Sequence, residues 1–376
     1  MNLILGAGEY KDQIKSLWKI AFSESDTFLN WYFDNQWDGN NAIALLDSNR
    51  VLAALEMKKY DQFMRGNIIK SSYVVGVSVL PQYRHRGFAT KIMVQSIVSS
   101  YNNGEVLSML IPFSYKFYRR MGYELCFTHG RMRFGRDDID LSQNMPGRVR
   151  RLSIDYYEKL NDIYLRFFKT ANGIIKRNPK DWGYIFDSTL MNGGGVFGYF
   201  ENDLCGYFTS YWHKGELRIG EICFLTPRAR TGMLLFISKL LDKDRTFTVD
   251  YPSFSNAAYF TNEPKEAAIK PTVMARVVNT RLALKQINSR ANLAIKVDDN
   301  FFPQNSGVFD MNGSSAKNYD FKMNINTFTK LYTGFTDTYE LYFNGEIKGN
   351  REKLDILNSV FPKCNNYIYH IMSNEL

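Results

Sequence analysis

The chain has 376 residues, which is too long for one ordinary hydrophobic core and predicts two or three domains. Hydrophobic residues make up 45% of the sequence and charged residues 23%, as in globular proteins in water, and no apolar run approaches the roughly 18 residues of a membrane span. The net charge of +9 is moderate for this length. Because no lysine/arginine block or nucleic-acid motif accompanies it, we expect neither nucleic acid nor a membrane as a partner.

Cysteine and histidine usage argues against a metal centre. The cysteines are far apart in the sequence and have no metal-ligand spacing, which favours reduced structural thiols (Cys126, Cys205, Cys223 and Cys364). Only four histidines are present, so we expect no histidine-rich metal site. The first residues lack the pattern of a signal peptide, and the cytoplasm is the expected location.

The N-terminal part is expected to contain a short strand, an amphipathic helix and an aromatic cluster. Residues 1–5 favour the strand and residues 9–22 favour the helix. Asp26 then precedes the aromatic cluster (Phe28, Trp31, Tyr32, Phe33 and Trp37). Two interpretations of the cluster remain open. It is either a helix that packs into the core, or a pocket wall in which Trp31 and Trp37 stack on a substrate and Asp26 pairs with its amine.

The most informative stretch is a strand, a basic glycine turn and a helix in residues 74–101. A β-branched apolar run predicts the strand, and Pro81 ends it because proline has no N–H to donate. Arg84-His-Arg-Gly87 predicts the turn. The N–H groups at a helix N-terminus bind anions, and Gly87 and Ala89 would leave room for a pyrophosphate. An ordinary strand–helix junction with solvated arginines is the alternative.

Two motifs in this region carry a family resemblance. Residues 106–111 predict a further strand, and a short helix over residues 113–121 is closed by Gly122. The turn Arg84-His-Arg-Gly87-Phe-Ala89 resembles the acetyl-CoA signature Arg/Gln-x-x-Gly-x-Gly/Ala of GNAT acetyltransferases. Phe117-Tyr118-Arg-Arg-Met-Gly122-Tyr123 resembles the family's Phe-Tyr-x-x-x-Gly-Phe/Tyr ending. Each motif alone would be weak, but the two occur in the family's order and together are a strong signal.

The segment from Arg148 repeats the strand–proline–helix plan without the glycine turn. We expect helices at residues 156–170 and 177–190 and strands at residues 196–200, 204–211 and 216–224. Aligning Pro227 with Pro81 puts three large residues where the first copy has its glycine turn (Met233, Leu234 and Leu235). These side chains would fill the space of a pyrophosphate. We therefore interpret the segment as a second copy of the fold without a cofactor site, and chance similarity of two junctions is the alternative.

The last segment, from about residue 288, is expected to be a small α+β module without a visible catalytic motif. Strands are predicted at residues 293–297, 307–311 and 319–324, and helices at residues 325–333, 339–343 and 351–360. With this segment the whole chain resembles the Eis-type (enhanced intracellular survival) N-acetyltransferases. The matching pieces are Leu225-Thr-Pro-Arg-Ala-Arg230, Met274-Ala-Arg-Val-Val278, Leu331-Tyr-Thr-Gly334 and the end of the chain.

The resemblance implies an α+β (mixed α/β) architecture of three domains. Residues 1–147 would be a catalytic GNAT domain, and residues 148–287 a degenerate GNAT domain without a cofactor site. Residues 288–376 would be a sterol-carrier-protein-like domain. A homo-oligomer, specifically a hexamer, is also implied.

The resemblance further implies an active site with acetyl-CoA as co-substrate and no metal. The cofactor would be held by the central stretch and the short helix (Val77, Ser78, Val79, His85, Arg86, Gly87, Phe88, Ala89, Thr90, Phe113 and Ser114). Tyr118 matches the family's general acid. The base would be the terminal α-carboxylate, here on Leu376 in place of the usual Phe, and Glu375 beside it would attract a cationic amine.

The implied activity is transfer of an acetyl group to a primary amine of a cationic small molecule, an aminoglycoside or a polyamine-like compound. Two alternatives remain open. The acceptor is instead a protein lysine, or the chain is a non-catalytic CoA-binding assembly protein.

Overall fold

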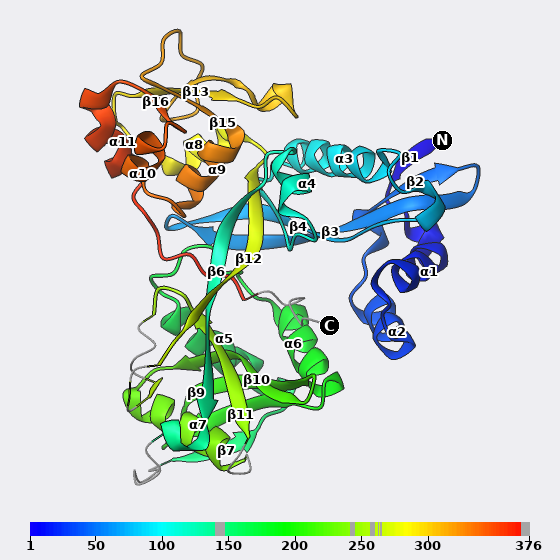
Figure 1. The fold of residues 1–376 in the computed structure, drawn as a ribbon, viewed down its shortest axis with the longest axis vertical. Helices are drawn as coiled ribbons and strands as arrows, with labels where there is room; N and C mark the ends of the chain where they lie inside the picture. Colours follow the sequence, from blue (N-terminus) through cyan, green and yellow to red (C-terminus); the bar gives the residue numbers. More distant parts are fainter. Residues whose placement is uncertain (140–146, 241–244, 256–259, 262, 264, 370–376) are drawn as a thin grey trace. The chain divides into compact units, whose positions relative to one another are not determined.

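The computed structural model describes residues 1–139, 147–240, 245–255, 260, 261, 263 and 265–369 (Figure 1). Helices and strands are mixed along the chain, which confirms the expected α/β class. The residues cluster into two compact units, and each unit is formed by two separate parts of the chain. The first unit contains Met1–Cys126 and Val273–Cys364, and the second contains Phe127–Thr272 and the tail that begins at Asn365.

The first unit is built on a sheet with the strand order β1-β2-β3-β4-β5-β12. Its strands are β1 (Asn2–Leu5), β2 (Ala42–Asp47), β3 (Arg50–Met64), β4 (Asn67–Val79), β5 (Leu107–Leu110) and the Val273–Val277 part of β12 (Ala268–Val277). Neighbouring strands are antiparallel except β4 and β5, which are parallel. Parallel neighbours need a crossover, and α3 (Phe88–Asn102) provides it.

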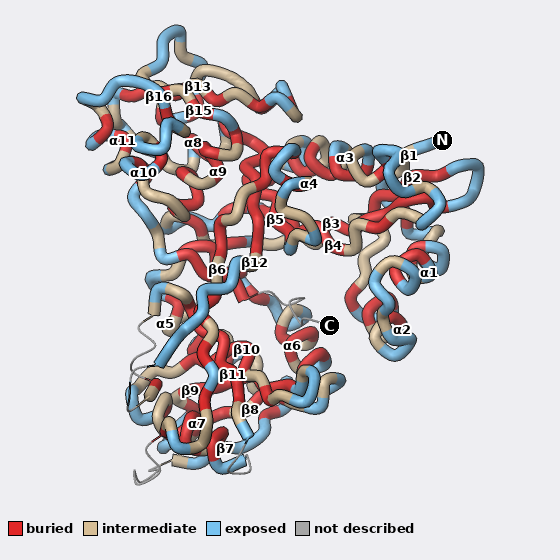
Figure 2. Tube along the Cα trace, viewed as in Figure 1, coloured by how far each residue is buried: buried red, intermediate tan, exposed pale blue. Residues whose placement is uncertain are grey.

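Helix α3 packs on this sheet through its apolar face. Ile92, Met93 and Ile97 are fully buried and share one core with the strand residues Leu52 and Val74. Figure 2 shows buried stretches along α3. Helix α1 (Lys11–Phe22) contacts β3 and β4, and α2 (Asp26–Asn35) packs on α1. The sheet is therefore covered by helices whose apolar spacing the sequence shows.

The C-terminal part of the first unit has a second, smaller sheet with the order β14-β13-β15-β16. Its strands are β13 (Ala294–Asp298), β14 (Gly307–Asp310), β15 (Phe321–Asn324) and β16 (Lys348–Gly349). The helices of this part are α8 (Thr280–Ile287), α9 (Ile325–Thr333), α10 (Thr338–Phe343) and α11 (Leu354–Val360). The strands and helices predicted from periodicity in this segment are confirmed.

The second unit has a sheet with the order β7-β8-β9-β10-β11-β6. Its strands are the Phe127–Gly135 part of β6 (Glu124–Gly135), β7 (Arg148–Arg151), β8 (Gly195–Phe200), β9 (Leu204–His213), β10 (Glu216–Phe224) and β11 (Thr246–Pro252). The α-helices in the described part of this unit are α5 (Tyr157–Phe167), α6 (Pro179–Met191) and α7 (Pro227–Lys239). As in the first unit, one pair of neighbours, β10 and β11, is parallel.

Two strands, β6 and β12, do not pair with the strand that precedes them in the chain. β6 follows β5 in the chain but pairs with β11 in the second unit, whereas β12 follows β11 but pairs with β5 in the first. The division into residues 1–147, 148–287 and 288–376, which follows the order of motifs along the chain, contains no such exchange. That division stays a prediction.

The two strand–helix junctions differ in the length of the link. In the first unit β4 ends at Val79 and α3 begins at Phe88, so residues 80–87 form a loop. In the second unit β10 ends at Phe224 and α7 begins at Pro227. Met233, Leu234 and Leu235 lie in the middle of α7 and are buried in the core of that unit. The second junction thus differs through a shortened loop, and these three residues are core rather than loop.

The tail that begins at Asn365 is anchored inside the second unit. The backbone N–H of Asn172 donates to the carbonyl of Asn365 at 2.8 Å, and that of Tyr367 donates to the carbonyl of Asn172 at 2.9 Å. The Tyr367 ring stacks on Phe168, with 4.5 Å between centroids. The proposed site residues Glu375 and Leu376 lie outside the described residues.

Candidate active site

The sheet of the first unit has an open backbone edge on β4. Its parallel pairing with β5 joins Ser71–Tyr73 to Leu107–Met109. β5 ends at Leu110, whereas β4 continues to Val79 along β3. Among the described strands, none pairs with β4 on this side beyond Tyr73. An extended ligand can add to such an edge as an extra strand.

A β-bulge bends β4 at the start of this open edge. The register with β3 shifts between Ala54 and Glu56, and Gly76 has a φ of +64°. A Cβ atom on Gly76 would lie 2.0 Å from the Trp18 ring, so both the backbone and the packing require glycine. A bulge leaves backbone groups out of the ladder and re-aims them. The sequence signal for this feature is the glycine inside Val74-Val-Gly-Val77.

The predicted pantetheine-binding residues follow the bulge directly. Val77 and Val79 are half-buried, and Ser78 is buried with its hydroxyl donating to the carbonyl of Gly76 at 3.0 Å. The Ser78 side chain is therefore used inside the sheet. What Val77–Val79 can offer a ligand is backbone N–H and C=O groups.

The basic turn lies at the N-terminus of α3, as predicted. Gly87 is the N-cap residue of α3 with a φ of +78°, and His85 has a φ of +63°. Arg84, His85, Arg86 and Gly87 are all exposed, and a Cβ atom on Gly87 would meet no atom within 4 Å. The first amides of the helix, on Phe88, Ala89 and Thr90, are the groups that lack helical acceptors. Exposed cations, unfilled space and helix N–H groups together form an anion-binding arrangement.

Tyr118 lies on the short helix α4 (Tyr115–Arg119), whose N-cap hydroxyl on Ser114 accepts the N–H of Phe117 at 3.3 Å. Its side chain is 2% exposed, and its ring makes edge contacts with Phe113, Phe117 and Tyr123. Burial, with a smaller contribution from Tyr123, raises the pKa of the Tyr118 phenol well above its usual value. The phenol therefore stays protonated at neutral pH. Phe113, beside it, is 69% exposed, which is unusual for so large an apolar side chain.

The backbone around Tyr118 is held by two residues from the C-terminal part of the same unit. Arg276 is fully buried, donates to the carbonyl of Met121 and pairs with Asp299. Asn326 donates to the carbonyls of Arg119 at 3.0 Å and Tyr123 at 3.2 Å. Neither residue was predicted from the sequence to have this role. The available signal was an arginine inside the apolar run Met274-Ala-Arg-Val-Val278.

Gly122 is explained by the same contacts. It has a φ of +82°, and a Cβ atom there would lie 1.9 Å from Nη1 of Arg276. The glycine of the Phe-Tyr-x-x-x-Gly motif is thus required by its left-handed backbone and by the guanidinium packed against it.

Two family models match the chain. Residues 6–126 match the acetyltransferase (GNAT) domain, and residues 276–369 match the sterol carrier protein domain. The first segment is a GNAT acetyltransferase domain. The expectations of an acyltransferase-type domain and of a sterol-carrier-like C-terminal domain are thereby confirmed. GNAT domains use acetyl-CoA as the acyl donor.

Solved structures share the fold over nearly the whole chain. A GCN5-related N-acetyltransferase from Anabaena variabilis has a TM-score of 0.85 at 19% identity, with 98% of this chain and 99% of that chain covered. A probable N-acyltransferase from Enterococcus faecalis has a TM-score of 0.83 at 20% identity, with 96% of each chain covered. Eis1 from Mycobacterium abscessus has a TM-score of 0.78 at 14% identity, covering 98% and 100%. No curated protein has significant sequence similarity to the chain.

The predicted substrate residues lie on or after α2 of the GNAT domain. The Asp26 carboxylate is exposed and pairs with Lys19 at 2.6 Å. Trp31 and Trp37 are half-buried, and their ring centroids lie 6.0 Å from that of Phe28 and 5.6 Å from that of Phe33, respectively. Tyr32 and Phe33 of the same cluster are buried core residues. The cluster therefore contains both core and partly exposed rings, and the substrate role stays a prediction.

A buried carboxylate of the GNAT domain was missed from the sequence. Glu56 on β3 is 2% exposed, accepts from the Tyr32 hydroxyl at 2.7 Å and from the backbone N–H of Asp38 at 3.1 Å, and lies 3.8 Å from the Lys58 ammonium. Burial raises its pKa, and Lys58 opposes that shift. These contacts tie α2 to the sheet beside the bulge. A glutamate in the apolar stretch Leu52–Met57 was the available sequence signal.

Within the described ranges, no group of three or more His, Cys, Asp or Glu side chains is arranged to hold a metal ion. The four cysteines all lie in the described part of the chain, and none of them forms a disulfide there. None of the helices in the described part of the chain is long and apolar enough to cross a membrane.

Proposed function

We propose that the chain is an acetyl-CoA-dependent N-acetyltransferase of the Eis type. Its acceptor is a primary amine of a cationic small molecule, of the aminoglycoside or polyamine class. The observation that carries the proposal is the arrangement in the GNAT domain of an open β4 edge, an exposed glycine turn at the start of α3 and a buried tyrosine on α4. The likeness in fold to Eis1 over 98% of the chain supports the Eis-type assignment.

In this proposal the cofactor runs from the turn to the open edge. The exposed guanidinium of Arg86, the His85 side chain and the amides from Gly87 to Thr90 take the pyrophosphate. The pantetheine arm adds to Val77–Val79 as an extra strand, and amides freed by the bulge point toward the thioester oxygen. Phe113 and Ser114 cover the thiol end of the arm. The 69% exposure of Phe113 is the observation behind that last assignment.

The reaction moves one acetyl group and three protons. The acceptor ammonium first loses one proton to a base, which leaves a free amine. The amine nitrogen attacks the thioester carbon, and the carbonyl oxygen gains negative charge that backbone N–H groups stabilise. The C–S bond then breaks, the C–N bond remains, and the sulfur accepts the proton of the Tyr118 phenol. Burial raises the pKa of this phenol, which guarantees the protonated form before the reaction. The nitrogen then gives its second proton to the Tyr118 phenolate, which leaves the neutral amide, the CoA thiol and the restored phenol.

We assign the base to the α-carboxylate of Leu376, with Glu375 adding negative potential that attracts the cationic acceptor. Both residues lie outside the described part of the chain. The tail that leads to them is anchored as far as Tyr369, since the Ile368 carbonyl accepts from His129 Nε2 at 2.6 Å and Tyr369 is 8% exposed. We assign Asp26, Trp31 and Trp37 to the acceptor. The proposal includes a homohexamer in the cytoplasm, as the family resemblance implies.

The test is a steady-state assay of thiol release from acetyl-CoA with a panel of amines. Aminoglycosides or polyamines should accelerate thiol release. Transfer to a lysine peptide but to no small amine would replace the acceptor class by protein lysine. Binding of CoA without turnover on any acceptor would contradict the enzyme and favour a CoA-binding assembly protein.

Tyr118→Phe tests the general acid. It should lower kcat about tenfold or more while the dissociation constant of acetyl-CoA stays nearly unchanged, because only the transferable proton is removed. Tyr115→Phe is the matched control, since it removes a hydroxyl from the same helix at a half-buried position. Equal kcat in the two variants would refute the role of Tyr118.

A further inference from the structure

The second unit contains a pocket at the place where its own parallel strands part. The pairing of β10 with β11 joins Leu217–Ile219 to Phe247–Val249. Beyond it, β10 continues to Phe224 along β9, and β11 continues to Pro252 along β6. In the first unit the same topological position is the open edge of β4, beyond its pairing with β5. The pocket therefore occupies the position that corresponds to the proposed thioester site.

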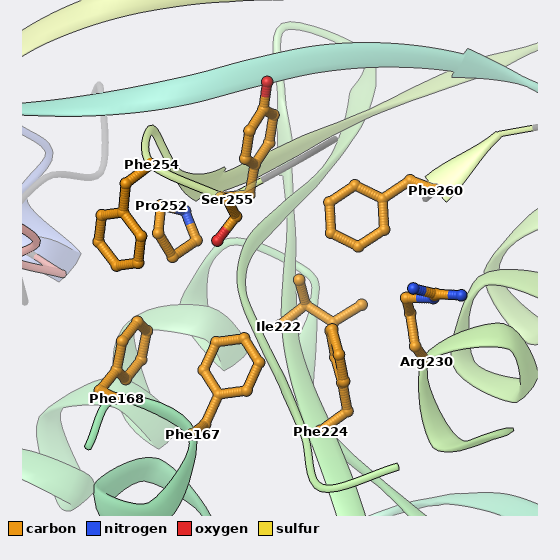
Figure 3. A pocket seen from close by; sticks show the side chains of 10 residues that line it. Phe167, Phe168, Ile222, Phe224, Arg230, Pro252, Phe254, Ser255 and Phe260 are labelled. Atoms are coloured by element: carbon orange, nitrogen blue, oxygen red, sulfur yellow. The ribbon is translucent and has the colours of Figure 1, made fainter. Parts of the chain in front are cut away.

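The pocket has a volume of about 290 Å³ and walls that are mostly aromatic (Figure 3). Ile222 and Phe224 line it from β10, Tyr251 from β11, and Phe167 and Phe168 from the end of α5. The volume is near the lower end of the range of small-molecule sites, about 300–1,000 Å³. Aromatic walls of this kind stabilise a ligand through apolar contact. The body of a ligand would have to be small and apolar.

One lining side chain gives the pocket a charge. Arg230 lies in the first turns of α7, directly after the short junction that replaces the glycine loop, and is half-buried. In Figure 3 its guanidinium lies on one side of the space, across from Phe167 and Phe168. Arginine is charged at all physiological pH values and has a planar fork of donors that matches a carboxylate. Among the described residues that line the pocket it is the only charged one.

A nucleotide cofactor does not fit this position. Its phosphates would need the loop and the exposed glycine turn that the first unit has in residues 80–87, and the second unit links β10 to α7 through residues 225 and 226 alone. The apolar walls also offer few polar groups to a pantetheine amide. The pocket is thus suited to a ligand with an apolar body and a single anionic head.

We propose that the second unit binds a medium-chain carboxylate in this pocket. The alkyl chain lies against Phe167, Phe168, Phe224 and Tyr251, and the carboxylate pairs with Arg230. This site is separate from the proposed acetyl-transfer site and does not depend on it. Its ligand contributes no acyl group to the reaction.

The test uses decanoate as the probe, below its micelle concentration, with decanol and decylammonium as neutral and cationic counterparts. Isothermal titration calorimetry on the full chain should show one decanoate site and weaker binding of decanol. Decylammonium should bind at least tenfold more weakly than decanoate, because its charge repels Arg230.

Variants locate the site. Arg230→Gln should weaken decanoate about tenfold or more, the loss expected for a charge-assisted hydrogen bond, while decanol binding stays unchanged. Arg228→Gln is the matched control, since Arg228 lies on the same helix, is exposed and does not line the pocket. Ser255→Trp places a large ring in the pocket from its half-buried rim and should abolish binding of both probes.

Three results would overturn the proposal. The first is no decanoate binding by the unmodified chain. The second is equal decanoate affinity in Arg230→Gln and Arg228→Gln, which removes the anionic head from the assignment. The third is decanoate binding that survives Ser255→Trp, which assigns the ligand to another part of the chain, such as the sterol-carrier-like segment. None of these readouts involves acetyl transfer, so the failure of either proposal leaves the other standing.

Discussion

Replacing Arg276 by methionine is the most direct test of the contacts that hold the Tyr118 segment. Arg276 and Asp299 are both fully buried at the side chain, and the guanidinium also binds the carbonyl of Met121. Burial lowers the pKa of this arginine, and the carboxylate of Asp299 opposes that shift. Methionine retains much of the side-chain volume and removes the charge and all five N–H donors.

The expected cost is about 3 kcal/mol of unfolding free energy. Breaking a buried ion pair by removing one partner typically costs about 3–5 kcal/mol, because the remaining charge is left uncompensated. Here Asp299 would still accept from the backbone N–H groups of Phe301 and Phe302, at 3.2 and 3.0 Å, and from the Asn305 amide at 3.1 Å. These retained bonds place the expectation at the lower end of the range. The double variant Arg276→Met with Asp299→Asn removes the stranded charge and should recover at least about 1 kcal/mol.

The assay is urea unfolding followed by far-ultraviolet circular dichroism, with the transition midpoint and slope compared between variants. Arg166→Met is the control, because Arg166 forms an exposed i,i+4 pair with Asp162 that should be worth less than about 1 kcal/mol. A loss below about 1 kcal/mol for Arg276→Met, or a double variant no more stable than the single one, would refute the assignment of a buried, charge-dependent clamp.

Three further predictions concern other parts of the chain. Gly122→Ala should lower the free energy of unfolding by about 1–3 kcal/mol or more, since alanine is strained at a φ of +82° and its Cβ would lie 1.9 Å from Arg276 Nη1. Gly66→Ala, also at positive φ but with no atom within 4 Å of the added Cβ, is the control for urea unfolding. Equal losses in the two variants would contradict the contribution of the clash with Arg276. Burial lowers the pKa of His129 below its usual 6.5, so the unfolded chain binds a proton that the folded chain does not, and the free energy of unfolding should fall as the pH drops below 6.5, by up to about 1.4 kcal/mol per pH unit. His129→Gln, measured by urea unfolding across that pH range, should make the free energy of unfolding less dependent on pH. An unchanged slope against pH would contradict the role of His129. A short peptide appended after Leu376 should abolish acetyl transfer, because it converts the α-carboxylate of Leu376 to an amide. The same peptide at the N-terminus is the control and should leave acetyl transfer unchanged. Full activity of the C-terminal fusion would exclude the α-carboxylate of Leu376 as the base.

Local patterns predicted the elements well. The apolar spacing of residues 88–101, the stop at Pro81 and the left-handed turn at Gly87 are all decided by neighbouring residues, and α3 begins at Phe88 as expected. The helices and strands of the C-terminal segment were predicted for the same reason. The exchange of β6 and β12 was not predicted, because it changes which strand pairs with β5 or β11 without changing any period along the chain.

The candidate site was predicted unevenly for a similar reason. The glycine turn and Tyr118 belong to contiguous motifs and can be read in order. The Gly76 bulge, the Glu56 carboxylate and the Arg276 clamp depend on contacts between residues far apart in the sequence. In the second unit, the alignment of Pro227 with Pro81 matched Met233–Leu235 to the glycine turn of the first unit. In the structure the helix α7 already begins at Pro227, so these residues lie within it and are buried in the core. A deletion in a loop shifts every later position, which an ungapped comparison cannot register.

These contacts imply that the GNAT domain depends on the C-terminal part of the first unit. The edge of β5 is paired by Val277–Met274 of β12, and the backbone of α4 is held by Arg276 and Asn326. Arg65 on β3's hairpin donates in turn to the carbonyls of Leu331 and Tyr332 at 2.8 and 2.6 Å. Residues 6–126 cut out alone would lose all of these partners and leave the β5 edge and the hydrogen bonds of α4 unsatisfied. The sterol-carrier-like segment is therefore part of what positions Tyr118, whether or not the end of the chain supplies the base.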